Sequence, residues 1–509
     1  MIKVSLQTKA SPLILTLVLA INAIFLRAAM YGQFDPGDNG SFMDLSWRIL
    51  CGQKLYVDVI THVQPLFPHI MALFFKLFGY GRHGALAHMV ISSSAMIFLV
   101  YAIARRLPVY AVATVLALTM TGFYWNYPFP NYNQDGFLFG MPGVWALSSQ
   151  IPFATKRSAF RTALLCGFFA VLSAMIKINI GVIYGAVFAG TLILGPFKKE
   201  SLAGFTAGGL AGIAFTLPMT GDLREFLSQN YLYARNQAIR GHHSHVFLVL
   251  KNWQVNGYWI PVTLVLLHLG KDVRKLLQRT ALFTGIFFVA VIHYYTSSMF
   301  IKAHIPLMGT LVGLGWLLLE EVRDNAGTGA ALKGIRRFTV PALIVFSVFQ
   351  MVQSAAFSSQ IAFGKAHPNP DLHREYVIKT EPLTGWQSPQ ALGEAFDQVS
   401  IYLNQSVPKK DSLLILAPLY PLYAMTGRQS YRGISYDFKI ENMPAPGAHV
   451  QRVKKVILNN PPDWLLTYKD ESPFPINAQL AYMEIQGFIL AHYKIEKSWG
   501  PIGLLKKVR

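Results

Sequence analysis

Long apolar runs follow one another along most of this chain, and they restrict its possible folds more than any other feature. They recur from Pro12 to about Ala356, with short polar joints between them. A helix needs about 20 apolar residues to cross a bilayer core, and backbone in lipid must satisfy its own hydrogen bonds. We therefore predict a polytopic α-helical membrane protein with about eleven spans, thirteen being the open alternative. The predicted spans cover residues 12–30, 86–104, 108–122, 136–153, 162–176, 180–195, 202–219, 255–270, 280–296, 304–321 and 339–356.

Charge supports this class and predicts an orientation. The chain is 14% charged, where soluble proteins average about 25%, and its net charge is +20. Basic residues gather in alternate joints, as the positive-inside rule expects of cytoplasmic loops. These inner joints contain Lys3, Lys9, Arg105, Arg106, Lys156, Arg157, Arg161, Lys198, Lys199, Lys271, Arg274, Lys275, Arg279, Arg323, Lys333, Arg336 and Arg337. The pattern predicts a plasma (inner) membrane protein with a cytoplasmic N-terminus and an outer C-terminus. The chain lacks the basic stripe of a nucleic-acid-binding protein, so nucleic acid is not an expected partner.

The first outer loop, residues 31–85, is unusually acidic for a chain this apolar. The stretch "FDPGDNGSFMD" contains Asp35, Asp38 and Asp44. The second half of the loop contains "PLFPHIMALFFKLFG" at 65–79, which is apolar but short for a span. We therefore predict a juxtamembrane helix there, lying along the outer surface. The first apolar run lacks a convincing small-residue cleavage site after it, and we expect it to be retained as a span.

The chain changes character near residue 357. The segments "SLLILAP", "DWLLTYK" and "YKIEKSWGPIGLLKKV" have the pattern of strands, and helical patterns alternate with them. We predict a small extracytoplasmic α/β domain over 357–509 with a closing hairpin near Gly500, after a membrane module over 1–356. The two cysteines, Cys51 and Cys166, are predicted in a loop and in mid-membrane, so no disulfide framework is expected.

The first loop carries a family resemblance. The stretch "DNGSFMDLSWRILCGQKLYVDVITHVQPLFPHIMALFFKLFG", residues 38–79, resembles the first outer loop of the GT-C membrane glycosyltransferases. Within them it is most similar to the branch of protein O-mannosyltransferases and lipid A aminoarabinose transferases. The matching positions are Asp38, Phe42, Gly52, Tyr56, Asp58, Pro65, Leu66 and Gly79. The stretches "SAMIKINIGV" (173–182) and "LLILAPLYPLYAMTGR" (413–428) also resemble family segments. The chain departs from the pattern at Asn39, where the family often has a second acid, and at Val63–Gln64, where the aminoarabinose transferases have a lysine and a proline.

The resemblance implies an inverting glycosyltransferase of the cell envelope. Its donor would be a sugar on a polyprenyl phosphate in the bilayer, and its acceptor a glycan, a lipid such as lipid A, or a protein. An acceptor hydroxyl needs a base to take its proton, and we expect Asp38 to be that general base because it holds the family position. The alternative is that Asp38 caps the helix that begins near Ser41.

Other candidates follow from charge and position. Tyr56 and Asp58 are expected to fasten the loop or to touch substrate, and Asp135, in "NYNQD", is a second outer carboxylate. Asp44 is interpreted as part of a solvated helix face. A phosphate leaving group needs cationic donors where its charge develops. Candidates are Lys177, Arg235, Arg240, His242, His243, His245, Lys302 and His304. Lys177 has the alternative of an interfacial lysine that extends to water between two short spans. No carboxylate stands at ligand spacing near the histidines, so no metal or other cofactor is expected, although a divalent ion is left open.

Two rival functions remain. A polymerase or ligase of lipid-linked glycans shares the apolar body, but usually carries its large catalytic loop late in the membrane part. A transporter would place polar residues along its mid-span positions and use broken helices in paired halves, and these spans are mostly free of buried charge.

Overall fold

The computed structural model describes most of the chain, in two compact units. The described residues are 2–30, 38–125, 128–151, 153–230, 278–279, 281–286, 289, 307–325, 352, 376–388, 390–416, 419–435, 454–468, 487–500 and 502–508. The first unit comprises Met1–Ala29, Met89–Thr216 and His242–Gln360, and the second Met30–His88, Leu217–Gly241 and Ile361–Arg509. Each is described separately below.

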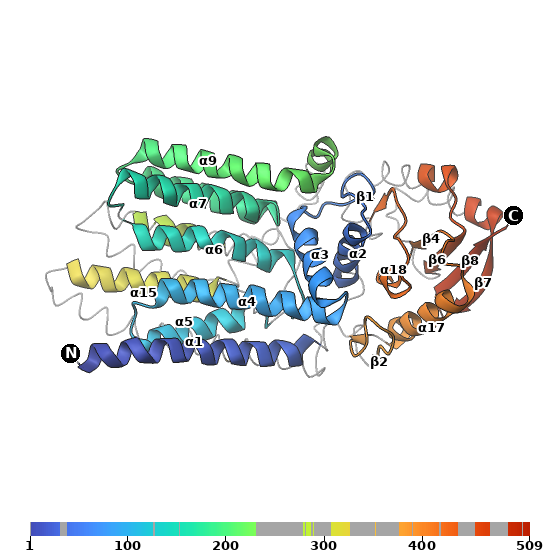
Figure 1. The fold of residues 1–509 in the computed structure, drawn as a ribbon, viewed down its shortest axis with the longest axis horizontal. Helices are drawn as coiled ribbons and strands as arrows, with labels where there is room; N and C mark the ends of the chain where they lie inside the picture. The colour runs from blue at the N-terminus through green and yellow to red at the C-terminus, as the bar shows by residue number, and fades with distance from the viewer. Residues whose placement is uncertain are drawn as a thin grey trace, which may run out of the picture. The chain divides into compact units, whose positions relative to one another are not determined.

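The first unit is a bundle of helices that lie side by side (Figure 1). Its elements are α1 (Ile2–Ala29), most of α4 (Arg82–Ala104), α5 (Val109–Phe123), α6 (Tyr132–Gln150), α7 (Lys156–Ala174), α8 (Ile178–Ile193), α9 (Lys198–Thr216) and α15 (Met308–Asn325). Four described segments are long and apolar enough to cross a membrane, namely Pro12–Ala29, Arg82–Ala104, Lys156–Ala174 and Lys198–Thr220. The chain is therefore a multi-pass membrane protein.

The helices agree with the predicted spans over the described residues. The predicted spans between residues 86 and 219 each overlap one of the helices α4 to α9. The predicted span 255–270 and most of the spans 280–296 and 339–356 lie outside the described residues. The total number of spans thus stays a prediction.

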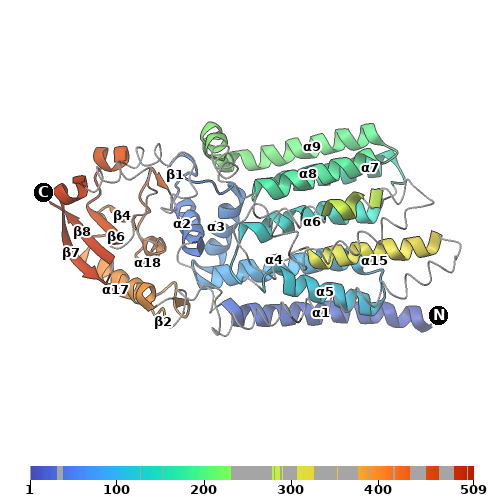
Figure 2. The same cartoon turned by 180° about the vertical axis from the view of Figure 1, so that it is seen from behind.

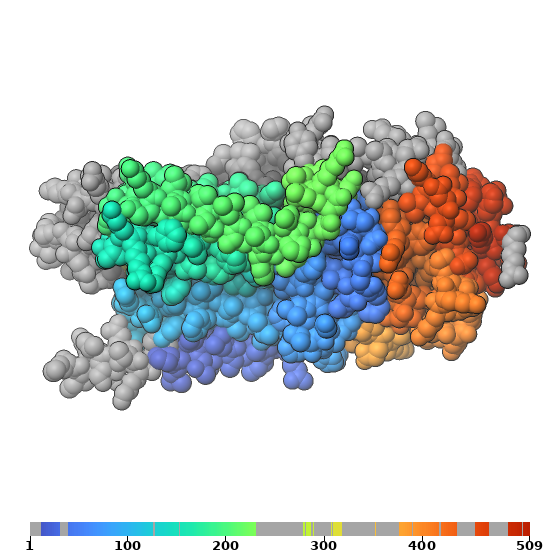
Figure 3. Space-filling model, turned by 45° about the horizontal axis from the view of Figure 1, so that its top comes forward, coloured from blue at the N-terminus to red at the C-terminus, as the bar shows by residue number. Residues whose placement is uncertain are grey.

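Glycines bring α7 and α9 into close contact. A Cβ added to Gly204 or Gly208 would lie 2.3 Å from the carbonyl oxygen of Phe160 or 2.0 Å from that of Leu164. Small residues four apart allow two membrane helices to pack backbone to backbone. The other side of α9 exposes large apolar side chains, among them Leu210 at 63%. In Figure 3, α9 lies at the surface of this unit, and Figure 2 shows α8 beside α7. An outward apolar face of this kind suits contact with lipid.

The second unit combines the first loop with the C-terminal part of the chain. The loop contributes α2 (Asp38–Leu50), β1 (Val59–Ile60) and α3 (Leu66–Phe78). Strand β1 pairs in parallel with β5 (Ile434–Ser435), so residues far apart in sequence are held together. The predicted helix at 65–79 is confirmed as α3, which buries Phe67 and Met71 and exposes Leu77 on its other side.

A mixed four-stranded sheet forms the core of the C-terminal part. Its strand order is β4 (Leu413–Leu416), β6 (Trp464–Tyr468), β8 (Ile502–Lys507) and β7 (Tyr493–Trp499). Strands β4 and β6 are parallel, and the other pairs are antiparallel. The helices α17 (Gln390–Ser406) and α18 (Leu422–Met425) and the short pair β2 (Tyr376–Val377) and β3 (Gln387–Ser388) complete it. The three predicted strand segments and the hairpin at Gly500 are confirmed.

Candidate functional site

The predicted base, Asp38, is the first residue of α2. Its side chain lies outside the described part of the structure, so its role stays a prediction. What the structure does describe is how α2 is held, and this determines where the backbone of Asp38 lies.

A buried ion pair sits in the middle of α2. The Arg48 Nε lies 2.7 Å from Asp44 Oδ2, and both side chains are fully buried. The Ser430 hydroxyl donates a hydrogen bond to the other carboxylate oxygen at 2.5 Å. Burial raises the pKa of Asp44, although the Arg48 charge and the hydrogen bonds from Ser430 and Arg48 oppose that rise. The interpretation of Asp44 as part of a solvated helix face is wrong, because its partners remove it from water.

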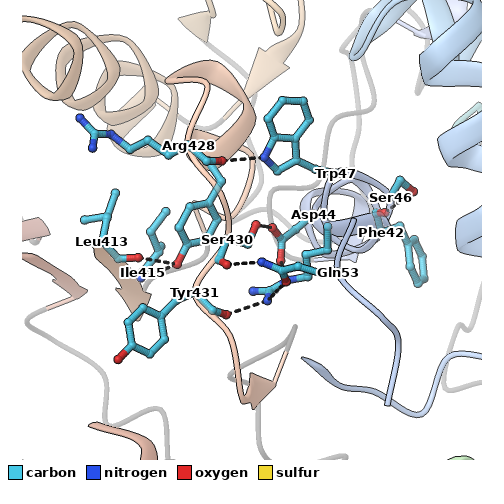
Figure 4. A network of polar contacts seen from close by, with 12 residues as sticks. Phe42, Asp44, Ser46, Trp47, Gln53, Leu413, Ile415, Arg428, Ser430 and Tyr431 are labelled. Atoms are coloured by element: carbon cyan, nitrogen blue, oxygen red, sulfur yellow. Dashed lines mark hydrogen bonds and ion pairs between the residues drawn. The ribbon is translucent and has the colours of Figure 1, made fainter. Parts of the chain in front are cut away.

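The same network ties α2 to residues 428–431 (Figure 4). The Arg48 guanidinium also donates to the Tyr431 carbonyl at 2.7 Å and to the Gln53 side chain at 3.1 Å. Trp47 Nε1 donates to the Arg428 carbonyl at 2.8 Å. These donors reach carbonyls that a loop would otherwise leave without partners, so the segment after α18 and the helix after Asp38 are fixed to each other.

Tyr56 and Asp58 fasten the rest of the loop. Tyr56 is buried with φ +65°, and its hydroxyl donates to the Val63 carbonyl at 2.6 Å. Burial raises the pKa of its phenol well above the usual value. The Asp58 carboxylate accepts from the Lys54 amide at 2.8 Å, and its other oxygen lies 3.7 Å from an Arg432 nitrogen. Both side chains therefore have structural partners, and their contact with substrate stays a prediction.

Asp135 and Lys177 come together in the helical unit. Asp135 lies in the first turn of α6, is buried, and accepts a hydrogen bond from Tyr124 at 3.1 Å. Lys177 is the residue before α8, and its ammonium nitrogen lies 3.9 Å from the centre of the Tyr132 ring. A Cβ added to Gly136, the residue after Asp135, would lie 3.3 Å from Lys177 Cβ. Two helix starts, a carboxylate and a cation thus share one end of this unit.

The remaining candidates are not described. Arg235, Arg240, His242, His243, His245, Lys302 and His304 lie outside the described residues. Within the described residues, no group of three or more His, Cys, Asp or Glu side chains could hold a metal ion.

One family model matches part of the chain. Residues 62–220 match the family model of dolichyl-phosphate-mannose-protein mannosyltransferases. The match covers somewhat less than a third of the chain, so it is a similarity of that part to the family. It agrees with the family resemblance that the sequence suggests, and the matched part of the chain includes Asp135 and Lys177.

Solved structures agree on the fold. Two crystal structures of ArnT from Cupriavidus metallidurans resemble this chain over nearly their whole length. The structure with bound undecaprenyl phosphate has 12% identity and a TM-score of 0.52, and covers 97% of this chain and 98% of that chain. The apo structure has 11% identity, a TM-score of 0.54 and 97% coverage of each chain. No curated protein sequence gives a significant match.

Sequence reasoning missed several residues of these clusters. Asp44 and Arg48 are four residues apart in a predicted helix, and opposite charges at this spacing indicate an ion pair on one helix face. Ser430 and Tyr431 carry no local signal, because only the fold brings them to α2. The Lys177–Tyr132 contact joins residues from two different apolar runs, and no spacing rule links them.

Proposed function

We propose that this chain transfers a sugar from a polyprenyl-phosphate donor to an acceptor at the outer face of the membrane, with inversion at the anomeric carbon. Asp38 takes the proton of the acceptor hydroxyl as its oxygen forms a bond to the anomeric carbon. The bond between that carbon and the phosphate oxygen breaks, and polyprenyl phosphate leaves with the bonding electrons. The acceptor is a glycan, a lipid or a protein.

The placement of Lys177 carries this proposal. A charged lysine in a helical membrane unit costs free energy unless it reaches water or pairs with an anion. Lys177 lies at the start of α8, beside the first turn of α6. A helix N-terminus and an ammonium group both favour a phosphate. The Tyr132 ring beneath the ammonium stabilises the charge by a cation–π contact without neutralising it. Lys177 would thus stabilise the phosphate as it leaves.

Other residues take supporting roles in this proposal. Asp135, next to Gly136 in the packed start of α6, would accept hydrogen bonds from the sugar. Arg235, Arg240, His242, His243, Lys302 and His304 would supply further donors to the phosphate or the sugar. The orientation follows the basic joints, with a cytoplasmic N-terminus and an extracytoplasmic C-terminal domain, so that the donor reaches the site from the outer leaflet.

The first experiment separates binding from chemistry. Undecaprenyl phosphate binding is measured on purified protein for wild type, Lys177→Met, Lys177→Arg and the control Lys199→Met, an exposed lysine. We expect Lys177→Met to weaken binding at least tenfold, and Lys177→Arg and Lys199→Met to remain within a few-fold of wild type. Equal binding by Lys177→Met would contradict the assignment of the phosphate site.

The second experiment tests the base. Asn is as good a helix cap as Asp, so Asp38→Asn keeps the capping function and removes the basicity. We expect Asp38→Asn to retain thermal stability and undecaprenyl phosphate binding, yet to lose release of polyprenyl phosphate from labelled polyprenyl-phosphate sugars by a hundredfold or more. Asp38→Ala should also lose stability if the residue caps α2. Full turnover by Asp38→Asn would remove Asp38 from the mechanism.

A further inference from the structure

A groove lies at the other end of α6 from Asp135. It has a volume of about 330 Å³ and is bordered by the last turns of α6, the link to α7 and the first turns of α7. At 1.5 Å per residue, Gln150 at this end is roughly 22 Å along the helix axis from Asp135. The groove is therefore separate from the proposed phosphate site and does not depend on the proposed function.

The mouth of the groove is polar and basic. Arg157 and Arg161 line it together with Ser149, Thr155 and Ser158. The two arginines stand four apart on α7, so their side chains leave the same face, about 6 Å from each other. Neither guanidinium has a hydrogen bond or ion pair to any other described residue. No carboxylate is among the residues that line the groove, so no described lining side chain compensates its positive charge.

A neighbouring lysine shows the contrast. Lys156, one residue before Arg157, forms an ion pair with Glu200 at 3.2 Å. Among the described side chains, Glu200 therefore pairs with the lysine and not with either arginine. Arginine suits phosphate because its planar fork can donate two parallel hydrogen bonds.

The other end of the groove is apolar and open to the side. Trp145, Ala146 and Leu165 line it, and Trp145 and Leu165 remain 38% and 36% exposed. Leu165 lies one turn beyond Arg161 along α7. A tryptophan at such a position is typical of the boundary between headgroups and hydrocarbon. The groove thus passes from a cationic polar mouth to an apolar surface within two turns of helix.

We propose that this groove binds one anionic phospholipid. The headgroup phosphate is held by Arg157 and Arg161, with a hydrogen bond from the hydroxyl of Ser149, and the first part of an acyl chain lies along Trp145 and Leu165. The exposed apolar end distinguishes a lipid from a soluble phosphate compound, which would leave that surface uncovered. In the orientation that the basic joints predict, the lipid belongs to the cytoplasmic leaflet.

The test uses purified full-length protein with phosphatidylglycerol or phosphatidylcholine added to detergent micelles, and measures bound lipid by native mass spectrometry. We expect wild type to retain phosphatidylglycerol in preference to phosphatidylcholine. The double variant Arg157→Gln/Arg161→Gln should weaken phosphatidylglycerol retention at least tenfold. The matched control Lys199→Gln removes an exposed charge outside the groove and should stay near wild type. Equal losses in the double variant and the control, or none in either, would overturn the site.

A second measurement identifies the occupant and does not depend on charge removal. Brominated phosphatidylglycerol quenches tryptophan fluorescence on contact, and Trp145→Phe removes one of nine tryptophans. We expect wild type to lose more fluorescence than Trp145→Phe with brominated phosphatidylglycerol, and the two to respond equally to brominated phosphatidylcholine. Inorganic phosphate at millimolar concentration should not displace the lipid. Displacement by phosphate, or equal quenching in both proteins with brominated phosphatidylglycerol, would argue against a lipid in this groove.

Discussion

Removal of Arg48 tests whether the buried network holds the first loop to the C-terminal part of the chain. The substitution Arg48→Met keeps most of the side-chain volume but leaves the buried Asp44 carboxylate without its counter-ion. Breaking one partner out of a buried pair costs about 3–5 kcal/mol. For a unit of roughly 230 residues, this corresponds to a fall in Tm of about 6–20 °C.

The assay is thermal unfolding of purified protein in detergent, followed by intrinsic fluorescence. The matched control is Arg432→Met, because Arg432 is 59% exposed and lies 3.7 Å from Asp58. Exposed pairs contribute only about 0–1 kcal/mol, so this variant should unfold within a few degrees of wild type. The double variant Asp44→Asn/Arg48→Met should recover at least half of the loss, since no charge is then stranded.

The effect of Arg48→Met should depend on pH. Burial already raises the pKa of Asp44 in the folded protein, and loss of the guanidinium raises it further. The folded state then binds the proton more readily than the unfolded state, so the cost is largest above the folded pKa and falls as the pH is lowered through it. We expect a larger Tm difference between variant and wild type at pH 8 than at pH 5. If Arg48→Met had the same Tm as Arg432→Met at both pH values, the assigned role of the network would be refuted.

Two further substitutions test local packing. Gly208→Ala places a methyl group 2.0 Å from the Leu164 carbonyl oxygen and should cost about 1–3 kcal/mol, measured as a lower Tm, whereas Gly209→Ala meets only a side-chain carbon at 3.9 Å and should be nearly neutral. A larger loss for Gly209→Ala would contradict the described α7–α9 contact. Tyr56→Phe removes the hydroxyl that donates to Val63 and should lower stability by about 0.5–1.5 kcal/mol, and an unchanged Tm would contradict a stabilising role for this bond.

Much of the fold could be predicted because short stretches of sequence determine its helices and strands. Each apolar run between residues 86 and 219 is long enough to indicate its helix, and Gly500 with Pro501 marks the turn between two strand segments. The helix at 65–79 was found for the same reason, since its length and apolar face exclude both a span and a loop. The partnership of residues 30–88 with 361–509 has no local pattern. It depends on β1 pairing with β5 and on α2 bonding to residues 428–431, and both join segments more than 300 residues apart.

The candidate site likewise contains residues that local sequence could indicate and residues that only the fold brings together. Lys177 could be selected because a charge within apolar sequence is costly, whatever surrounds it. Asp44 was misjudged because a helix face rich in polar residues has the same pattern whether water or another segment covers it. Its burial depends on Ser430 and Tyr431, which supply a hydroxyl and a carbonyl to the pair. The acid that the family resemblance selects and the acid that the fold buries lie six residues apart on one helix. The network around Asp44 is therefore a physical means by which the C-terminal part can fix the backbone from which Asp38 extends.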